Sequence, residues 1–363
     1  MADAPSLFLC VDCGGTKTAA SIASKDGTIV GRGFGGPSNY TDIGLAKFVQ
    51  SFGEAVIAAY TQAIGPTANA PKIELPLAEG ALSAAWVGVS GIDSQEGVIA
   101  LTGALAPLLS LPPKAPQLIV ANDTHLLASP IRLHPDVRTA IVVIAGTGSN
   151  AAAFRSSDDG TLQELGRAGG WGFLLGDEGS GFFVGRETVR EILTRADGAA
   201  ISGKPVSPSI LRDKVFAEFE ITDPYDVFSV IYAPDPDPNA TAKPAKKILE
   251  KERKHRMASL TPFAFEAAFE HNDELALTVI RNSARLHANQ IASLLKTPNT
   301  TSAPQHAAVA ADSILCLGGT LVSKEPYRKV LAEELEKLGH KFRYTQYVEN
   351  VTDLGAAGIA AFI

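Results

Sequence analysis

The sequence has only three cysteines, Cys10, Cys13 and Cys316, among 363 residues. That number is too small for a disulfide framework, and a chain of this length buries enough apolar surface to fold without one. We therefore expect reduced thiols and a cytoplasmic location. Cys10 and Cys13 have C-x-x-C spacing, but no second cysteine pair accompanies them, which favours a packing role over a metal or redox role.

Basic residues are in the minority as well, because 32 Lys and Arg stand against 39 Asp and Glu, a formal net charge of −7. Proteins that bind nucleic acid through its phosphates normally show the opposite excess, so no nucleic-acid partner is expected. A long apolar run is also missing, since prolines interrupt the uncharged stretch 97–113. The residues before Leu7 include no Lys or Arg, and we expect neither a signal peptide nor a membrane partner. A homodimer is left open.

What the sequence does contain is an internal repeat. When Leu7–Thr16 is placed over Ala140–Ser149, the triplet Asp26-Gly27-Thr28 lies over Asp159-Gly160-Thr161. In each copy an apolar strand enters a Gly/Thr turn, a second short strand leaves it, and the Asp-Gly pair turns the chain into a third strand. At roughly 150 residues per domain, the length also suggests two domains.

Strands alternate with helices along the rest of the chain, a pattern typical of the α/β class. We expect strands at 84–89, 117–121 and 313–317, and helices at 44–64, after Ser94, after Glu178, at 273–295 and after Glu325. The proline-rich stretches 65–76, 233–244 and 297–304 are predicted to be surface loops. The basic run 243–256 also contains glutamates and predicts a solvated helix face.

Two familiar nucleotide motifs are incomplete. Gly31-Arg-Gly-Phe-Gly-Gly36 fits G-x-G-x-x-G, but it ends a hairpin and does not join a strand to a helix, so it predicts no dinucleotide site. Residues 198–204 nearly form a Walker A loop. Pro205 stands where a Ser or Thr hydroxyl should reach Mg²⁺, and we reject that interpretation.

The two repeated turns are better candidates for phosphate binding. Their glycines expose backbone N–H groups that an oligophosphate can approach closely, and hydroxyls and a lysine accompany them. The alternative is a pair of ordinary hairpin turns, which would not need these glycines in equivalent places. Asp12, at the end of the first strand, could hold Mg²⁺ directly or through water. The residues expected at the phosphates are Gly14, Gly15, Thr16 and Lys17 in the first turn, and Thr147 and Gly148 in the second.

Asp123 is the best candidate for acid–base chemistry. It directly follows the predicted strand 117–121, and ligands of open α/β sheets bind at the carboxyl ends of the strands. A helix N-cap at residues 122–124 is an equally open interpretation. Further on, six glycines surround Trp171 and Asp177 in the loop 169–181, which suits a polar ligand such as a sugar. Gly318 and Gly319 repeat the transition from strand to glycine and would let the backbone approach a ribose.

Taken in order, these residues resemble the eukaryotic N-acetylglucosamine kinases, in the BadF/BadG/BcrA/BcrD ATPase-like branch of the actin, Hsp70 and sugar kinase superfamily. The matching motifs are Asp12-x-Gly-Gly-Thr-x-Thr18, Pro37-Ser-Asn39, Asn122-Asp123, Gly146-Thr-Gly-Ser-Asn150, Gly170-Trp-Gly172, Gly176-Asp-Glu-Gly-Ser180 and Cys316-Leu-Gly-Gly319. The resemblance implies an α/β, two-lobed actin-like (ribonuclease H-like) fold with duplicated mixed sheets and a cleft between the lobes. One lobe would comprise residues 1–137, completed by a helix at 351–363, and the other residues 138–350.

The same resemblance implies transfer of a phosphoryl group from ATP, with Mg²⁺, to the 6-hydroxyl of N-acetyl-D-glucosamine. Asp123 would take the proton from that hydroxyl, Thr16 and Thr147 would contact the phosphates, and Gly318 and Gly319 would border the adenosine. The sugar would be lined by Asn39, Ser149, Asn150, Gly170, Trp171, Gly172 and Asp177. A kinase for glucosamine or another amino sugar, a non-sugar ATPase partner subunit of the BadF type and a sugar-sensing regulator remain as alternatives.

Overall fold

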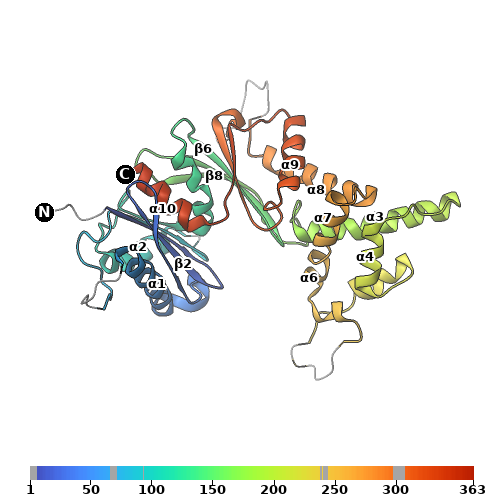
Figure 1. Ribbon diagram of the computed structural model, residues 1–363, viewed down its shortest axis with the longest axis horizontal. Helices are drawn as coiled ribbons and strands as arrows, with labels where there is room; N and C mark the ends of the chain where they lie inside the picture. Colours follow the sequence, from blue (N-terminus) through green and yellow to red (C-terminus); the bar gives the residue numbers. More distant parts are fainter. Residues whose placement is uncertain (1–5, 66–71, 93, 238, 240–243, 297–306) are drawn as a thin grey trace.

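The computed structural model describes residues 6–65, 72–92, 94–237, 239, 244–296 and 307–363. Its framework is a pair of five-stranded mixed sheets (Figure 1). The first contains β1 (Leu7–Cys13), β2 (Thr18–Ser24), β3 (Ile29–Gly35), β4 (Ala84–Val89) and β5 (Leu118–Asn122), in the order β3-β2-β1-β4-β5. The second contains β6 (Thr139–Ala145), β7 (Ser149–Ser156), β8 (Leu162–Gly169), β9 (Ser313–Gly318) and β10 (Tyr344–Tyr347), in the order β10-β9-β6-β7-β8.

Both sheets have the same topology. In each, the first three strands form an antiparallel meander and the remaining two are parallel to the first.

The helices are α1 (Tyr40–Ile64), α2 (Gln95–Leu109), the 3-10 helix η1 (Asp123–Leu133), α3 (Gly181–Ser202), α4 (Ile210–Phe219), α5 (Val227–Ile231), α6 (Arg253–Ala258), α7 (Thr261–Phe269), α8 (Glu274–Ala292), α9 (Glu325–Lys337) and α10 (Val351–Phe362), with short 3-10 turns at Pro224–Asp226, Lys247–Glu250 and Ala310–Asp312. The predicted α/β fold is confirmed.

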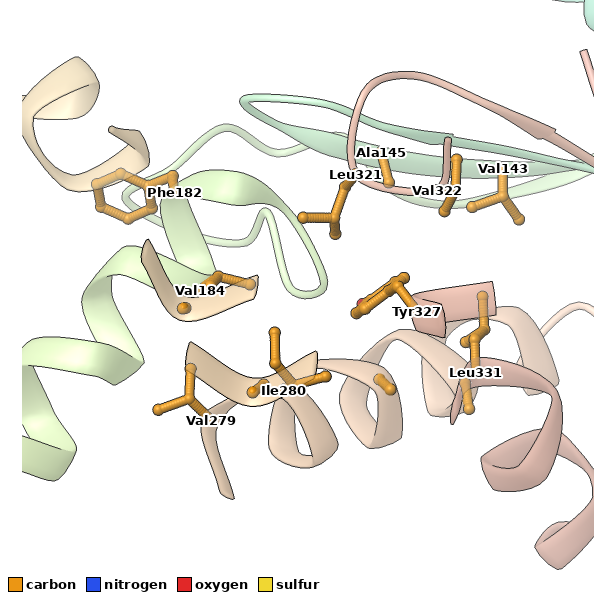
Figure 2. Packing of buried hydrophobic residues seen from close by; sticks show 14 of the residues in the cluster. Val143, Ala145, Phe182, Val184, Val279, Ile280, Leu321, Val322, Tyr327 and Leu331 are labelled. Atoms are coloured by element: carbon orange, nitrogen blue, oxygen red, sulfur yellow. The ribbon is translucent and has the colours of Figure 1, made fainter. Parts of the chain in front are cut away.

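Alternating side chains place each sheet between two layers. Leu9, Val11 and Cys13 of β1 pack with α1 and α2, whereas Phe8 and Cys10 face the layer that holds η1 and α10. The second sheet contributes its inner face to that same middle layer and packs its outer face against α3, α7, α8 and α9. Figure 2 shows Val143 and Ala145 of β6 facing side chains of α3, α8 and α9. Cys10 and Cys13 therefore lie in different cores, which confirms their packing role.

The helix α10 follows the second sheet in sequence but packs against β1, β2 and η1, beside the first sheet (Figure 1). The Ser21 hydroxyl lies 2.7 Å from Thr352 Oγ1 and donates to Asp353 Oδ1 at 2.6 Å. Arg32 forms an ion pair with Asp353 at 2.8 Å. A Cβ on Gly355 would lie 2.3 Å from Cys10 Sγ, so a glycine is needed where α10 crosses β1.

The two halves of the internal repeat have the same topology, but the ungapped alignment of the repeat is wrong by one residue where β1 is compared with β6. Cys13 and Ala145 end β1 and β6 and both face the outer helices, whereas the ungapped repeat pairs Cys13 with Gly146. A slip of one residue moves a strand's side chains to the opposite face. Equivalent β-bulges occur in the following hairpins. Gly27 and Gly160 have the positive φ expected of the Asp-Gly turns, 83° and 81°.

The glycines of the rejected G-x-G-x-x-G motif have a packing role. A Cβ on Gly31, Gly33 or Gly35 would lie 2.1 Å from a carbonyl oxygen of α1. The alternating glycines therefore let α1 lie directly on β3, with no helix N-terminus for a dinucleotide.

The basic run 243–256 is not a solvated face throughout, which corrects that prediction. Arg256 is fully buried and donates to the carbonyl oxygens of Lys251, Val230, Ala233 and Pro234. These four carbonyl acceptors compensate the guanidinium for its loss of water.

Part of the proline-rich loops can be compared with the prediction. Residues 72–76 and 233–237 form neither helix nor strand, as expected of loops. Residues 66–71, 238, 240–243 and 297–304 of these predicted loops lie outside the described residues. No helix in the described part of the chain is long and apolar enough to cross a membrane.

Candidate functional site

Two carboxylates meet at the carboxyl ends of the parallel strands of the first sheet. Asp12 on β1 is paired with Gly88 on β4, and Asp123 follows β5 as the first residue of η1. A Cβ on Gly88 would lie 3.1 Å from Asp123 Cα and 2.5 Å from Leu126 Cδ1. Gly88 therefore lets η1 cross the strand ends closely enough to bring Asp123 beside Asp12. The sequence carries one signal for this contact, a glycine inside a buried strand, but Gly88 was not among the predicted site residues.

The two carboxylates influence each other electrostatically. Burial, followed by the negative charge of Asp123, raises the pKa of Asp12 to about 6, and Lys17 opposes both effects. A half-buried carboxylate of this kind is a hard oxygen donor whose charge a divalent cation would stabilise. The donor set at Asp12 therefore fits Mg²⁺.

The helix-cap interpretation left open for residues 122–124 applies to Asn122. Its Oδ1 accepts hydrogen bonds from the Thr124 N–H at 3.1 Å and the Thr124 hydroxyl at 2.8 Å. Its Nδ2 donates to the Ile92 carbonyl oxygen at 3.2 Å. The N-cap of η1 is therefore Asn122, and Asp123 is the first residue of that helix.

The first predicted phosphate turn has an exposed tip. The Gly14 N–H donates to the Lys17 carbonyl oxygen at 3.1 Å, and Gly15, Thr16 and Lys17 are exposed. Thr18 is buried instead, and its hydroxyl donates to the Gly36 carbonyl oxygen at 2.7 Å. Thr16 is therefore the hydroxyl of this turn that a ligand can reach.

The second turn is fixed to the start of α3. The carbonyl oxygens of Gly146 and Thr147 accept from the N–H groups of Gly181 at 2.7 Å and Phe182 at 3.2 Å, while Thr147 itself is exposed. Beside the turn lies a cavity of about 280 Å³. Its lining residues are Gly146, Thr147, Gly181, Ala258, Thr261, Pro262, Phe265, Thr320, Leu321 and Lys324. The walls from α6 and α7 were not predicted from the sequence.

Gly318 and Gly319, which were predicted to border a nucleoside, directly precede two residues that line this cavity. Gly319 has φ 101°, and a Cβ there would lie 2.5 Å from the Ala145 carbonyl oxygen. That close approach places Thr320 and Leu321 in the cavity wall. A Cβ on Gly318 would lie 2.8 Å from Leu127 Cδ2, so Gly318 contacts η1 four residues beyond Asp123.

The glycine-rich loop is held by buried groups. Asp177 is 3% exposed and has a left-handed φ of 62°, and its Oδ1 accepts from the Ser149 N–H at 3.1 Å. The Ser149 hydroxyl donates to the Glu178 carbonyl oxygen at 2.6 Å. Lys254 of α6, which no sequence motif indicated, lies 3.6 Å from Asp177 Oδ2. Ser149 and Asp177 therefore tie the second phosphate turn to the loop.

Other predicted sugar residues offer groups to a ligand. Trp171 is 68% exposed on the loop, and Gly170 and Gly172 beside it have positive φ. Asn150 lies next to Gly170, and its buried Oδ1 has no hydrogen-bond partner among the described residues. A buried acceptor without a protein donor is rare, and it is open to a hydrogen bond from a bound ligand or a water molecule.

Asn39 is the N-cap of α1. Its Oδ1 accepts from the N–H of Thr41 at 3.1 Å and of Asp42 at 3.4 Å. The Thr41 hydroxyl donates to the Gly91 carbonyl oxygen at 2.6 Å, and a Cβ on Gly91 would lie 2.4 Å from Asn39 Oδ1. Asn39 is thus held against the loop that follows β4.

Two sheets of the same topology, each with a glycine turn after its first strand, are the architecture of the two-lobed actin-like ATPases. The chain belongs to the BadF/BadG/BcrA/BcrD ATPase family, whose sequence pattern matches residues 9–357. The resemblance stated from the motifs is therefore confirmed at the level of the family.

Similar sequences carry sugar kinase names. The chain is 26% identical over 293 residues to N-acetyl-D-glucosamine kinase of Dictyostelium discoideum, an alignment that covers 80% of this chain and 79% of the relative. It is 27% identical over 223 residues to N-acetylmuramic acid/N-acetylglucosamine kinase of Clostridium acetobutylicum, covering 61% of this chain and 63% of that one.

Solved structures agree in fold. A provisionally named N-acetylglucosamine kinase of Chromobacterium violaceum superimposes with a TM-score of 0.54 at 22% identity, over 98% of this chain and 99% of that chain. A ROK hexokinase of Thermus thermophilus gives 0.50 at 16% identity, over 98% of both. At these identities the likeness supports the fold alone.

Proposed function

We propose that this protein is an ATP-dependent kinase that phosphorylates the 6-hydroxyl of N-acetyl-D-glucosamine in the cytoplasm. The observation that carries the proposal is the placement of two acidic residues, Asp12 and Asp123, together at the carboxyl ends of the parallel strands. One carboxylate can hold a metal ion, while the other deprotonates a hydroxyl, which are the two tasks of a phosphoryl-transfer site. The family match and the names of the two sequence relatives support the same reaction.

In this proposal the nucleoside of ATP binds in the cavity beside the second turn. Phe265, Pro262 and Leu321 supply apolar walls for the base, and Thr147 and Lys324 supply polar groups. Its phosphates extend to the exposed N–H groups of Gly15 and Thr16 and to Lys17. Asp12 would hold Mg²⁺, directly or through water, and the ion would stabilise the charge on the transferred phosphoryl group.

The acceptor sugar binds between Asp123 and the glycine-rich loop. Asn150 Oδ1, which lacks a donor among the described residues, accepts a hydrogen bond from the sugar, and the face of Trp171 packs against the ring. In this proposal Asn39, Gly170 and Gly172 would also border the sugar, and the hydrogen bonds of Ser149 to Asp177 and to Glu178 would hold the loop in place. Asp123 orients the 6-hydroxyl and accepts its proton as the phosphorus–oxygen bond forms.

The test is ADP release from Mg-ATP with and without sugar. We expect turnover to depend on added N-acetylglucosamine and the product to carry phosphate at position 6, as read by ³¹P–¹H NMR. The same assay should be run with glucosamine, N-acetylmannosamine, N-acetylmuramic acid and glucose, because these sugars differ from N-acetylglucosamine only in a substituent or in the configuration at one carbon. Equal turnover with no sugar would favour the ATPase-subunit alternative and remove the kinase proposal.

A further inference from the structure

The short helix α6 contacts both halves of the proposed site. Its last residue, Ala258, lines the nucleoside cavity, and the Lys254 side chain, one turn earlier, reaches the glycine-rich loop. Neither the sequence motifs nor the family match gives Lys254 a role. It lies in the basic run that was expected to be solvated.

Two residues of the loop contact the Lys254 ammonium group. Its Nζ lies 3.6 Å from Asp177 Oδ2 and 5.6 Å from the centre of the Phe173 ring. Phe173 in turn packs edge-on against Phe182 at the start of α3, with centroids 5.1 Å apart. The lysine therefore contacts the middle of the loop at two positions, by a cation–π contact with Phe173 and an ion pair with Asp177.

Asp177 depends on this partner. Its carboxylate is 3% exposed, and Oδ2 has no hydrogen bond among the described residues, so Lys254 is the cation that faces it. Removing one member of a buried ion pair leaves the other charge uncompensated. Through Oδ1 the same carboxylate holds the Ser149 N–H in the second turn.

The position of α6 itself is tightly fixed. A Cβ on Gly185 of α3 would lie 1.8 Å from the Met257 carbonyl oxygen, so the two helices are in backbone contact. The Thr261 hydroxyl, directly after α6, donates to the Gly181 carbonyl oxygen at 2.8 Å. Lys254 thus extends from a rigid wall of the nucleoside cavity to a loop that this lysine helps to hold.

We propose that Lys254 is a positioning residue that acts through Asp177, fixing the glycine-rich loop for the acceptor sugar from the wall of the nucleoside cavity. This inference rests on the proposed kinase function. It assigns Lys254 no contact with either substrate, so its removal affects sugar binding far more than nucleotide binding.

The experiment compares Lys254→Gln and Lys254→Arg with Lys251→Gln. The control removes a neighbouring lysine, whose Nζ pairs with Glu218 at 3.4 Å away from the loop. We expect Lys254→Gln to raise the KM for sugar about tenfold, with the KM for ATP nearly unchanged. Lys254→Arg restores most of the loss, and Lys251→Gln behaves like the unmodified protein. Equal factors in both KM values, or no change in either, would overturn the proposal.

A double-mutant cycle tests the route through Asp177. If Lys254 acts through that carboxylate, Lys254→Gln adds nothing further in an Asp177→Asn background, whereas independent effects would multiply. Amide hydrogen exchange tests the positioning role even if the protein shows no sugar-dependent turnover and the kinase proposal fails. Faster exchange at residues 170–180 in Lys254→Gln, and not in Lys251→Gln, still supports the positioning role, and equal protection in both refutes it.

Discussion

Gly148 and Asp177 are in such close contact that a side chain at position 148 would displace the Asp177 carboxylate. A Cβ on Gly148 would lie 2.9 Å from both carboxylate oxygens of Asp177, nearer than real Cβ atoms approach. The glycine therefore allows the carboxylate to reach the N–H of Ser149, the next residue. The backbone of the turn and the position of the loop are thus set together.

We predict that Gly148→Ala displaces Asp177 and destabilises the protein by about 1–3 kcal/mol. Sugar-dependent turnover should fall at least as far as in Lys254→Gln, because the same carboxylate moves. Gly146→Ala is the matched control in the same turn, since its Cβ would meet nothing nearer than Thr320 Oγ1 at 3.9 Å. Urea unfolding of both variants decides the matter, and equal stability losses would show that the contact is unimportant.

Asp123→Asn should keep binding and lose catalysis. The amide is nearly the same size as the carboxylate but cannot accept the hydroxyl proton, so we expect kcat to fall by about 10²–10⁴. The Kd values for ATP and sugar, measured by calorimetry, should change much less. A nearly normal rate would reduce Asp123 to a structural residue of η1.

Asp12→Asn should make the metal-free protein more stable at neutral pH. The pKa of Asp12 is raised to about 6, mainly by burial, so between roughly pH 4 and 6 the folded state binds a proton that the unfolded state has lost. Stability contributed by this group therefore decreases as pH rises through that window, by up to about 3 kcal/mol. Urea unfolding in EDTA should show a gain for Asp12→Asn at pH 7.5 that shrinks near pH 4, together with loss of Mg²⁺-dependent turnover. A destabilised variant at pH 7.5 would contradict this account.

The stability contributed by His287 should have the opposite pH dependence. It is fully buried on α8, its ring lies against Gly179 of the loop, and burial lowers its pKa to about 4. The unfolded state, with an ordinary pKa near 6.5, takes up a proton first as the pH falls, so stability is lost between about pH 6.5 and 4, by at most about 3 kcal/mol. His287→Gln should lose less stability than the unmodified protein between pH 7.5 and 4.5. Parallel losses in the two proteins would exclude His287 as the source.

Local patterns were sufficient to predict much of the fold. The buried strand β4 has the predicted bounds Ala84–Val89, because a short apolar run between turn residues has few alternative structures. The Gly/Thr turns after β1 and β6 were found in the same way. Their register was not, because the strand ends Cys13 and Ala145 are 132 positions apart whereas the turn glycines Gly27 and Gly160 are 133 apart, and no single ungapped shift fits both.

The direction of side chains in the site could not be predicted. Glycines around Asp177 indicate a shaped loop, but only the left-handed φ of Asp177 turns its carboxylate inward to Ser149. Lys254 lay in a run of charges that resembles a solvated face, and its ion pair is with a residue distant in sequence. Contacts of that kind depend on how α3 and α6 pack against each other, and this packing cannot be predicted from the local sequence.

The packing of α10 against β1 has a consequence for biosynthesis. Gly355 touches Cys10, a partner that leaves the ribosome hundreds of residues earlier. Contacts of such long sequence separation slow folding. Until α10 emerges, the inner face of the first sheet, with Phe8 and Trp86, is covered only in part, by η1, on the nascent chain. We expect that face to require chaperone protection throughout translation of the second sheet.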